Sequence, residues 1–350
     1  MNNPDILLTA DTHQKITDFV RQRLHARHVV IHSHVQALWG GQGHIIRLKT
    51  DVPDCKSVIV KFIAPSDSAS HPRGWNTSRS FTRKTQSYAV EAAWYSRFAA
   101  RCGQRCKVPT LLGLQEDENT RLFLLEDLAV KFPASPARLT VKQVSVCLDW
   151  LAAFHAQFLF DAGEGLWPQG CYWHLQTRED EWHAMKDSPV KKAATWLDNQ
   201  LLSARFQTLV HGDAKLANFC FSNNLSRVAA VDFQYVGRGC GMSDVAYLLG
   251  SCLTEDDCHA HDKALLEIYF TALRQALSMQ TEHDPPGQTN PISADPQLLA
   301  DELINEWRGL YAVAWTDFYR FLLGWMPQHT KINSYTEKQA EEALSGWAGS

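Results

Sequence analysis

The sequence lacks the features expected of a membrane, secreted or nucleic-acid-binding protein. It contains 34 Lys and Arg residues against 38 Asp and Glu residues, a net charge of −4, so no strong attraction to nucleic acid or anionic membranes is expected. Its longest apolar stretches, including residues 311–326, are interrupted by charged residues, so no membrane span is predicted. The first residues do not show the basic and then apolar pattern of a secretory signal. We therefore expect a cytoplasmic protein, monomeric or homodimeric, without a nucleic-acid partner.

Paired cysteine motifs are also missing. The nine cysteines are an odd number and contain no C-x-x-C pair, and Cys102 and Cys106 have no second pair nearby. This pattern indicates reduced thiols, buried or incidental, rather than disulfides or a metal site. The 350 residues have 45% apolar content, which is enough for two domains with sizeable cores.

The segment LVHGDAKLANFCF, followed by VAAVDFQ, carries the clearest chemical pattern (residues 209–234). Asp213 and Asn218 have the spacing of the kinase catalytic loop H-R-D-x-x-x-x-N, in which Asp accepts the substrate hydroxyl proton and Asn holds Mg²⁺. Lys215 is placed to neutralise charge on a phosphoryl group in transfer. The apolar pieces flank a polar turn and predict a hairpin, which would return Asp232 to the loop as the main metal ligand. A lone HGD tripeptide is common, but the combined spacing favours phosphoryl transfer.

A candidate clamp for nucleotide phosphates precedes this segment. Lys61 lies in the β-branched strand SVIVKFIA, similar to the kinase strand V-A-I-K, whose Lys contacts the phosphates. A Lys in a short apolar strand is otherwise more often an edge-strand residue that prevents aggregation. Gly40, Gly41 and Gly43 lie between two strand-like runs, where they would let backbone amides approach phosphate oxygens. The same glycines also suit an ordinary hairpin turn, because they do not complete G-x-G-x-x-G.

Glu91 is the candidate carboxylate that orients Lys61. It lies in SYAVEAAWYSRFAA, whose apolar residues have helical spacing, and it follows the Lys strand in the chain. An exposed Glu in a helix otherwise needs no function. Two strands are expected next, at 110–114 and 121–125. They end in the segment where we expect backbone groups to read the adenine edge: Glu126, Asp127 and Leu128.

The order of these motifs resembles a known family of small-molecule kinases. The motifs WGGQGH, VIVK, a helical Glu, LLEDL, LAAFHA, HGDAKLANF, VDFQ and GMSDVAYLL follow one another as in the aminoglycoside phosphotransferase and choline kinase superfamily. The pairing of HGD with DFQ and D-V-A-Y-L-L is most similar to its ecdysteroid kinase-like branch. The resemblance spans about residues 38–249, and the block from HGD to DFQ is its specific part.

The resemblance implies a fold, two cofactors and a set of roles. The implied fold is α+β, bilobal and protein-kinase-like. A small antiparallel sheet with one main helix would occupy residues 1–126, and a larger, mainly helical part residues 127–350. ATP would be the phosphoryl donor, Mg²⁺ the metal and a small-molecule hydroxyl the acceptor. By motif position, the implied roles are base for Asp213, metal ligands for Asn218 and Asp232, phosphate clamp for Lys61 and structural brace for Asp244.

Helical patterns continue through most of the chain after residue 127. Residues 140–160 carry apolar side chains at helical spacing, which fits a long central helix. His155 lies on this apolar helix. We expect it to be a buried structural residue rather than a catalyst.

The acceptor is expected to be a small molecule, because the peptide platform of a protein kinase is missing. Protein kinases carry a long activation segment ending in A-P-E between the metal-binding Asp and the next helix. Only residues 233–243 separate Asp232 from Asp244, and no A-P-E follows. Gly212 also replaces the Arg that would read a phosphorylated activation segment. Activity is therefore expected not to depend on phosphorylation of this loop.

Abundant aromatic residues in the second half leave the acceptor's identity open. They could line an apolar pocket or hold a quaternary ammonium, but core packing is the commoner role of large aromatics. The acidic residues 255–257 could attract a cationic acceptor or simply begin a helix. A sterol-like alcohol is preferred, followed by choline-like, aminoglycoside or macrolide acceptors. The aromatic residues are Trp167, Trp173, Trp182, Trp196, Trp307, Trp315, Trp325, Tyr311, Phe318 and Tyr319.

A catalytically silent nucleotide-binding module with the same fold is the second functional class. A silent relative is free to lose the residues that carry the reaction. Lys61, Asp213, Asn218 and Asp232 are all present here. The sequence therefore favours an ATP-dependent small-molecule O-kinase.

Overall fold

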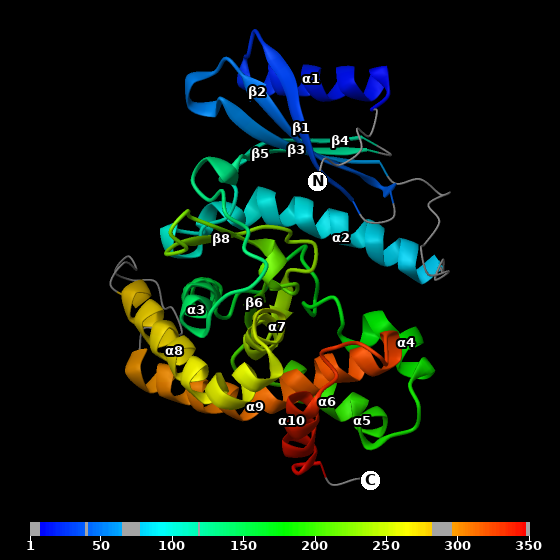
Figure 1. Ribbon diagram of the computed structural model, residues 1–350, viewed down its shortest axis with the longest axis vertical. Coiled ribbons are helices and arrows are strands. Elements are labelled where there is room, and N and C mark those ends of the chain that lie inside the picture. Colours follow the sequence, from blue (N-terminus) through cyan, green and yellow to red (C-terminus); the bar gives the residue numbers. More distant parts are fainter. Residues whose placement is uncertain (1–7, 39–40, 65–77, 118–119, 282–295, 348–350) are drawn as a thin grey trace. The chain divides into compact units, whose positions relative to one another are not determined.

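The structure is a computed structural model that describes residues 8–38, 41–64, 78–117, 120–281 and 296–347 (Figure 1). The chain forms two compact units. The first unit comprises Met1–Ala100 and Val108–Pro133, and the second comprises Arg101–Lys107 and Ala134–Ser350.

The division between the units differs from the predicted boundary after residue 126. Asp127 stays with the first unit, because its carboxylate accepts a hydrogen bond from Ser57 Oγ at 2.6 Å. Residues 101–107 instead belong to the second unit, where the Lys107 carbonyl accepts a hydrogen bond from Trp150 Nε1 at 3.0 Å. These contacts join residues far apart in the chain, so the strand pattern alone could not reveal them.

The first unit contains one antiparallel sheet of five strands in the order β1-β2-β3-β5-β4. The central strand β3 is rich in Val and Ile, which suit a buried strand. Lys49 to Gly43 of β2 pair with Ser57 to Ile63 of β3 in unbroken antiparallel register. The strands are β1 (Val29–Ala37), β2 (Gly43–Thr50), β3 (Ser57–Ile63), β4 (Leu111–Glu116) and β5 (Arg121–Glu126).

Two helices cover opposite faces of this sheet (Figure 1). Successive side chains of a strand point to opposite faces, so Val60 and Phe62 join a core with α1 (Ala10–Leu24), while Lys61 points toward α2 (Ser78–Arg97). The helix α1 is an addition to the single main helix that the sequence predicted. Its buried apolar residues at positions 16, 19 and 20 have helical spacing, so the sequence did contain a signal for it.

The second unit is mainly helical, with two small two-stranded sheets. Helix α3 begins at a capping box formed by Thr140 and Gln143 and packs along α8 (Figure 1). The helices are α3 (Val141–Gln157), α4 (Glu179–Ala184), α5 (Pro189–Lys192), α6 (Ala194–Leu202), α7 (Met242–Cys252), α8 (Glu255–Thr281), α9 (Pro296–Trp325) and α10 (Ser334–Leu344). The sheets pair β6 (Thr208–Val210) with β9 (Gly237–Gly239) and β7 (Phe219–Phe221) with β8 (Val228–Ala230).

The fold class predicted from the sequence is confirmed. A small antiparallel sheet, a Lys-bearing strand, a Glu-bearing helix and a mainly helical second unit follow one another as in the protein-kinase-like fold. None of the described helices combines the length and apolar character needed to cross a membrane. All nine cysteines are free thiols.

Candidate active site

The predicted hairpin is present in the second unit. Strand β6 leads into the predicted catalytic loop, residues 211–218, and β7 and β8 then pair antiparallel, with Phe221 opposite Val228. Strand β9 returns the chain to β6 after Asp232. The loop and Asp232 are therefore supported on both sides by short strands. The sequence did not reveal the β6–β9 pair, because each strand has only three residues.

Asp213 is buried, and its two carboxylate oxygens have different surroundings. Oδ2 accepts hydrogen bonds from Lys215 Nζ at 2.8 Å and from Asn218 Nδ2 at 3.0 Å. Asn218 Nδ2 also donates to the carbonyl of Asp213 at 2.8 Å. Oδ1 is buried and has no hydrogen-bond partner among the described residues. The carboxylate is thus held through one oxygen, and its other oxygen accepts no hydrogen bond from the described residues.

The charges around Asp213 favour proton acceptance. Burial raises the pKa of its carboxyl, the ammonium of Lys215 opposes this shift, and the carboxylate of Asp232 adds to it. Partial burial lowers the pKa of Lys215, but Asp213 and Asp232 outweigh this and raise it above its ordinary value. One ammonium therefore faces two carboxylates. A carboxylate with a raised pKa is a better general base than an exposed one.

Asp232 and Asn218 offer neighbouring oxygen ligands. The Val231 N–H donates to the Asn218 carbonyl at 2.9 Å. This bond holds Asp232, the next residue in the chain, near Asn218. Asp232 has a φ of +70°, which is uncommon for a residue other than Gly and typical of functional sites. Carboxylate and amide oxygens suit Mg²⁺, which keeps several waters and binds substrate phosphates. The described residues contain no group of three or more His, Cys, Asp or Glu side chains able to hold a metal ion. The donor set therefore fits Mg²⁺ only when phosphate and water complete it.

Asp244 braces the catalytic loop from α7. Its carboxylate accepts hydrogen bonds from the backbone N–H of His211 at 2.5 Å and of Gly212 at 2.9 Å, and it lies 3.2 Å from His155 Nε2. His155 and Asp244 are fully buried. Gly212 has a φ of +77°, and a Cβ atom there would lie 2.1 Å from the carbonyl oxygen of Tyr235. A side chain is therefore excluded where protein kinases carry an Arg.

Lys61 and Glu91 form a buried ion pair in the first unit. Lys61 Nζ lies 2.7 Å from each carboxylate oxygen of Glu91. Strand β3 lies between β2 and β5, so Lys61 is not on an edge strand. The contact that the motif order predicted is present, and the alternative of an edge-strand lysine is excluded.

We expect the substitution Lys61→Met to destabilise the protein, because it leaves the Glu91 carboxylate buried without its partner. The free energy of unfolding should fall by about 3–5 kcal/mol. Adding Glu91→Leu to this variant should restore most of the stability, since the second buried charge is then removed as well. Urea unfolding of both single variants and the double variant measures the coupling. If the loss of stability in the double variant equals the sum of the losses in the two single variants, the pair does not act as a unit.

The glycine-rich turn is partly explained by packing. A Cβ atom on Gly43 would lie 2.0 Å from the carbonyl oxygen of Phe62, so the close approach of β2 to β3 requires glycine. Gly41 has a φ of +70°, open space around its Cα, and an N–H that donates to the Leu38 carbonyl at 3.1 Å. Gly40 lies outside the described residues. Phosphate binding by this turn stays a prediction.

The side chains of the predicted adenine segment are engaged in structural contacts. The carboxylate of Glu126 accepts hydrogen bonds from the N–H and hydroxyl of Thr110. Burial raises the pKa of Asp127, but Arg47 and Ser57 outweigh this effect and hold it below its usual range. Leu128 is buried at the start of a short 3-10 helix. Any reading of adenine here is therefore left to the backbone, as the sequence predicted, and stays a prediction.

An aromatic cluster that sequence reasoning did not assemble lies beside the catalytic loop. The Tyr172 N–H donates to the Gly212 carbonyl, and the Tyr172 and Tyr247 hydroxyls lie 3.1 Å apart. Burial and then the charge of Asp213 raise the pKa of Tyr247. Trp173, Phe318 and Trp325 were among the aromatic residues noted in the sequence, and Tyr247 lies within D-V-A-Y-L-L, but their spacing did not indicate that they pack together. The aromatic cluster consists of Tyr172, Trp173, Tyr247, Phe318, Phe321 and Trp325.

Two other predicted aromatics and two of the acidic residues have structural surroundings. Trp307 and Trp315 are buried, and Trp307 Nε1 donates to the Phe206 carbonyl. Glu255 accepts hydrogen bonds from Ser334, and Asp257 from Thr254 at the start of α8. The interpretation of residues 255–257 as the start of a helix is therefore supported.

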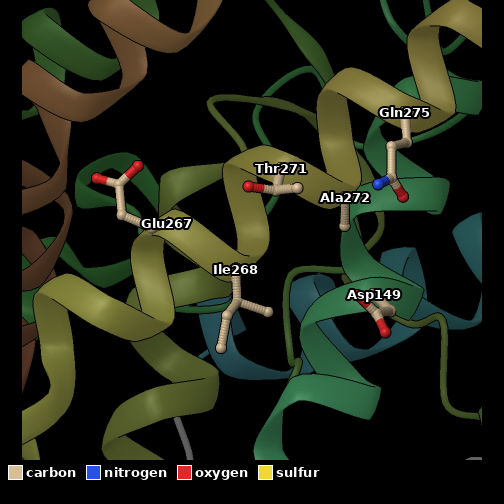
Figure 2. Close-up of a pocket in the computed structure, with 6 residues that line it drawn as sticks. All are labelled: Asp149, Glu267, Ile268, Thr271, Ala272 and Gln275. Atoms are coloured by element: carbon tan, nitrogen blue, oxygen red, sulfur yellow. The ribbon is translucent and has the colours of Figure 1, made fainter.

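An open cavity of about 330 Å³ lies between α3 and α8, away from the residues predicted to carry the chemistry (Figure 2). Figure 2 shows Asp149 of α3 across from side chains of α8. The Glu267 carboxylate at its edge forms an ion pair with Arg308. The lining residues are Asp149, Glu267, Ile268, Thr271, Ala272 and Gln275.

Comparisons with solved structures find small-molecule kinases at low identity. An aminoglycoside-3′-phosphotransferase of type VIII is 17% identical, over 84% of this chain and 98% of that chain, with a TM-score of 0.42. An aminoglycoside phosphotransferase from Streptomyces rimosus, in complex with ADP and streptomycin, is 12% identical over 87% and 99%, with a TM-score of 0.44. An ethanolamine kinase from Plasmodium vivax is 11% identical over 89% and 81%, with a TM-score of 0.43.

A comparison with protein-family models matches part of the chain. No curated protein matches the sequence. Residues 171–282 match the model of the ecdysteroid kinase-like family. This segment contains Asp213, Asn218, Asp232 and Asp244. The resemblance to the ecdysteroid kinase-like branch, predicted from these motifs, is thus confirmed for the segment that carries the hairpin from HGD to DFQ.

Proposed function

We propose that this protein is an ATP- and Mg²⁺-dependent phosphotransferase that moves the γ-phosphoryl group to a hydroxyl of a small molecule. The observation that carries the proposal is the burial of the Asp213 carboxylate and the unequal hydrogen bonding of its two oxygens. Its Oδ2 is held by Lys215 and Asn218, while its Oδ1 is buried and has no hydrogen-bond partner among the described residues. A buried carboxylate oxygen that accepts no hydrogen bond destabilises the fold. Its presence is best explained by a catalytic role.

The reaction follows from these groups. Asp213 Oδ1 accepts the hydroxyl proton while the acceptor oxygen forms its bond to the γ-phosphorus, the bond to the ADP oxygen breaks, and ADP leaves. Lys215 stabilises negative charge on the phosphoryl group in transfer. Lys61, oriented by Glu91, binds the nucleotide phosphates. Mg²⁺, held by Asn218 and Asp232, would neutralise the phosphate oxygens.

The short link after Asp232 supports a small-molecule acceptor. Strand β9 (Gly237–Gly239) pairs with β6, and α7 begins at Met242. The link between Asp232 and Asp244 is therefore taken up by a strand and the start of a helix. A peptide-binding platform of the protein-kinase type has no room in this segment.

Transfer of phosphate from labelled ATP tests the proposal. We expect the purified protein with ATP and Mg²⁺ to phosphorylate one or more alcohols in a metabolite extract, detected by mass spectrometry of the labelled products. The product should require Mg²⁺ and should be absent with heat-treated protein. Binding of ATP without transfer to any acceptor would instead identify a silent nucleotide-binding module.

A further inference from the structure

Lys331 places a positive charge on the faces of two rings of the aromatic cluster. Its Nζ lies 5.0 Å from the centre of the Tyr247 ring and 5.5 Å from that of Phe318. Both distances are within the range of cation–π attraction. Among the residues that the structure describes, no hydrogen bond or ion pair to this ammonium is found. The two rings are therefore its main partners.

Lys331 lies close enough to the catalytic loop to interact with its charges. Burial lowers the pKa of Lys331 to about 8, while the charges of Cys252 and Asp213 act to raise it and that of Lys215 to lower it. With this pKa the side chain is still mostly protonated at neutral pH. Burial raises the pKa of the Cys252 thiol to about 11, so this neighbour is neutral. The carboxylate of Asp213 is already shared with Lys215, so no carboxylate is dedicated to Lys331.

A second cation lies over two further rings of the cluster. The Arg178 guanidinium lies 5.5 Å from the centre of the Tyr172 ring and 5.1 Å from that of Phe321. It is held there by an ion pair with Glu181 at 2.9 Å and by a hydrogen bond that its Nε donates to the Tyr172 carbonyl. Cations of the protein itself therefore lie over four of the six rings of the cluster.

We infer that Lys331 determines acceptor specificity: it excludes cationic alcohols and selects an uncharged alcohol with an apolar body and a second oxygen that accepts a hydrogen bond. This inference rests on the proposed function and narrows its acceptor class. A cationic acceptor would have to displace the ammonium from Tyr247 and Phe318 while being repelled by it. An uncharged alcohol can pack against the edges of the aromatic cluster. One of its oxygens then provides the hydrogen bond that Lys331 lacks.

Direct binding of tetramethylammonium tests whether Lys331 occupies a cation site. Substitution Lys331→Ala leaves the two ring faces uncovered. We therefore expect this variant to bind tetramethylammonium about 2- to 30-fold more tightly than the wild type does. The exposed Lys338 of α10 supplies the matched control, and Lys338→Ala should behave as the wild type. Lys331→Gln keeps most of the aliphatic side chain and serves as a control for loss of folding. Its affinity for tetramethylammonium should rise less than that of Lys331→Ala. Calorimetric titration that finds equal affinities in wild type and Lys331→Ala overturns the inference, as does tight binding by the wild type.

A matched pair of acceptors tests the consequence for catalysis. Choline and 3,3-dimethylbutan-1-ol differ only in a positively charged nitrogen and a neutral carbon. The wild type should have the higher kcat/KM for the neutral alcohol. In Lys331→Ala, the ratio of kcat/KM for choline to kcat/KM for 3,3-dimethylbutan-1-ol should rise by about 2- to 30-fold. An unchanged ratio with measurable transfer refutes the inference and leaves the proposed function standing. Absence of transfer to every alcohol refutes the proposed function, and the tetramethylammonium titration then still decides the role of Lys331.

Discussion

Substitution of Asp213 by Asn is expected to lower kcat/KM for phosphoryl transfer by about 10²- to 10⁴-fold, the range for loss of a general base. Asn has the size of Asp and can still accept hydrogen bonds from Lys215 and Asn218 through its amide oxygen. It cannot accept the proton of the acceptor hydroxyl. The loss should therefore fall on kcat, with little change in the affinity for ATP. Steady-state kinetics with a labelled acceptor measures both.

The same substitution should not lower stability. Burial raises the pKa of the Asp213 carboxyl, so the folded protein binds this proton more tightly than the unfolded chain does. At pH values above the raised pKa, the buried charge therefore destabilises the fold. This cost disappears as the pH falls below the carboxyl's unfolded value of about 4. The amide of the Asp213→Asn variant carries no charge, so we expect its melting temperature to equal or exceed that of the wild type at pH 7. The difference should shrink in acid. Loss of both activity and folding would mark Asp213 as structural.

Removal of the brace at Asp244 is expected to produce a large loss of stability. Substitution Asp244→Ala leaves the N–H groups of His211 and Gly212 buried without acceptors and leaves His155 without its carboxylate partner. Unsatisfied buried donors destabilise by about 1–3 kcal/mol each, so the free energy of unfolding should fall by about 3–5 kcal/mol. Urea unfolding followed by tryptophan fluorescence measures the change.

Two further variants separate the brace from a general effect of removing acidic residues. Asp244→Asn keeps one acceptor oxygen and should lose less stability than Asp244→Ala. Asp149→Ala removes an exposed carboxylate of α3 and should change the free energy of unfolding by no more than about 0.5 kcal/mol. Because Asp244 acts by holding the loop in place, the fraction of the Asp244→Asn variant that remains folded should show a reduced kcat. Near wild-type stability and kcat in Asp244→Ala would contradict the role of a brace.

The local chemistry of the second unit could be predicted from the sequence because its residues are close in the chain. Asp213, Lys215 and Asn218 lie within one loop, and their mutual hydrogen bonds follow from that short spacing. The strands of the hairpin were also predictable, since their apolar pieces flank a polar turn. The ion pair between Lys61 and Glu91 spans a longer separation, but the order of a strand and the next helix was enough to indicate it.

Other features depend on segments that are far apart in the chain. His155 was expected to be a buried structural residue, and the structure adds its contact with Asp244 on α7. Helix α1 covers one face of the sheet without contributing any chemical motif. The aromatic residues were visible in the sequence, but helical spacing identifies only a buried face and does not identify the ring that packs against it.

The sequence by itself therefore determined the type of reaction we propose, because base, amide, ammonium and second carboxylate lie within a short hairpin. Only the tertiary structure decided how that loop is held and which charges cover the neighbouring rings. Lys331 follows α9 and reaches Tyr247 of α7 through packing between the two helices. Contacts of this kind depend on the three-dimensional path of the chain, since a cation and a ring need only spatial proximity to attract each other.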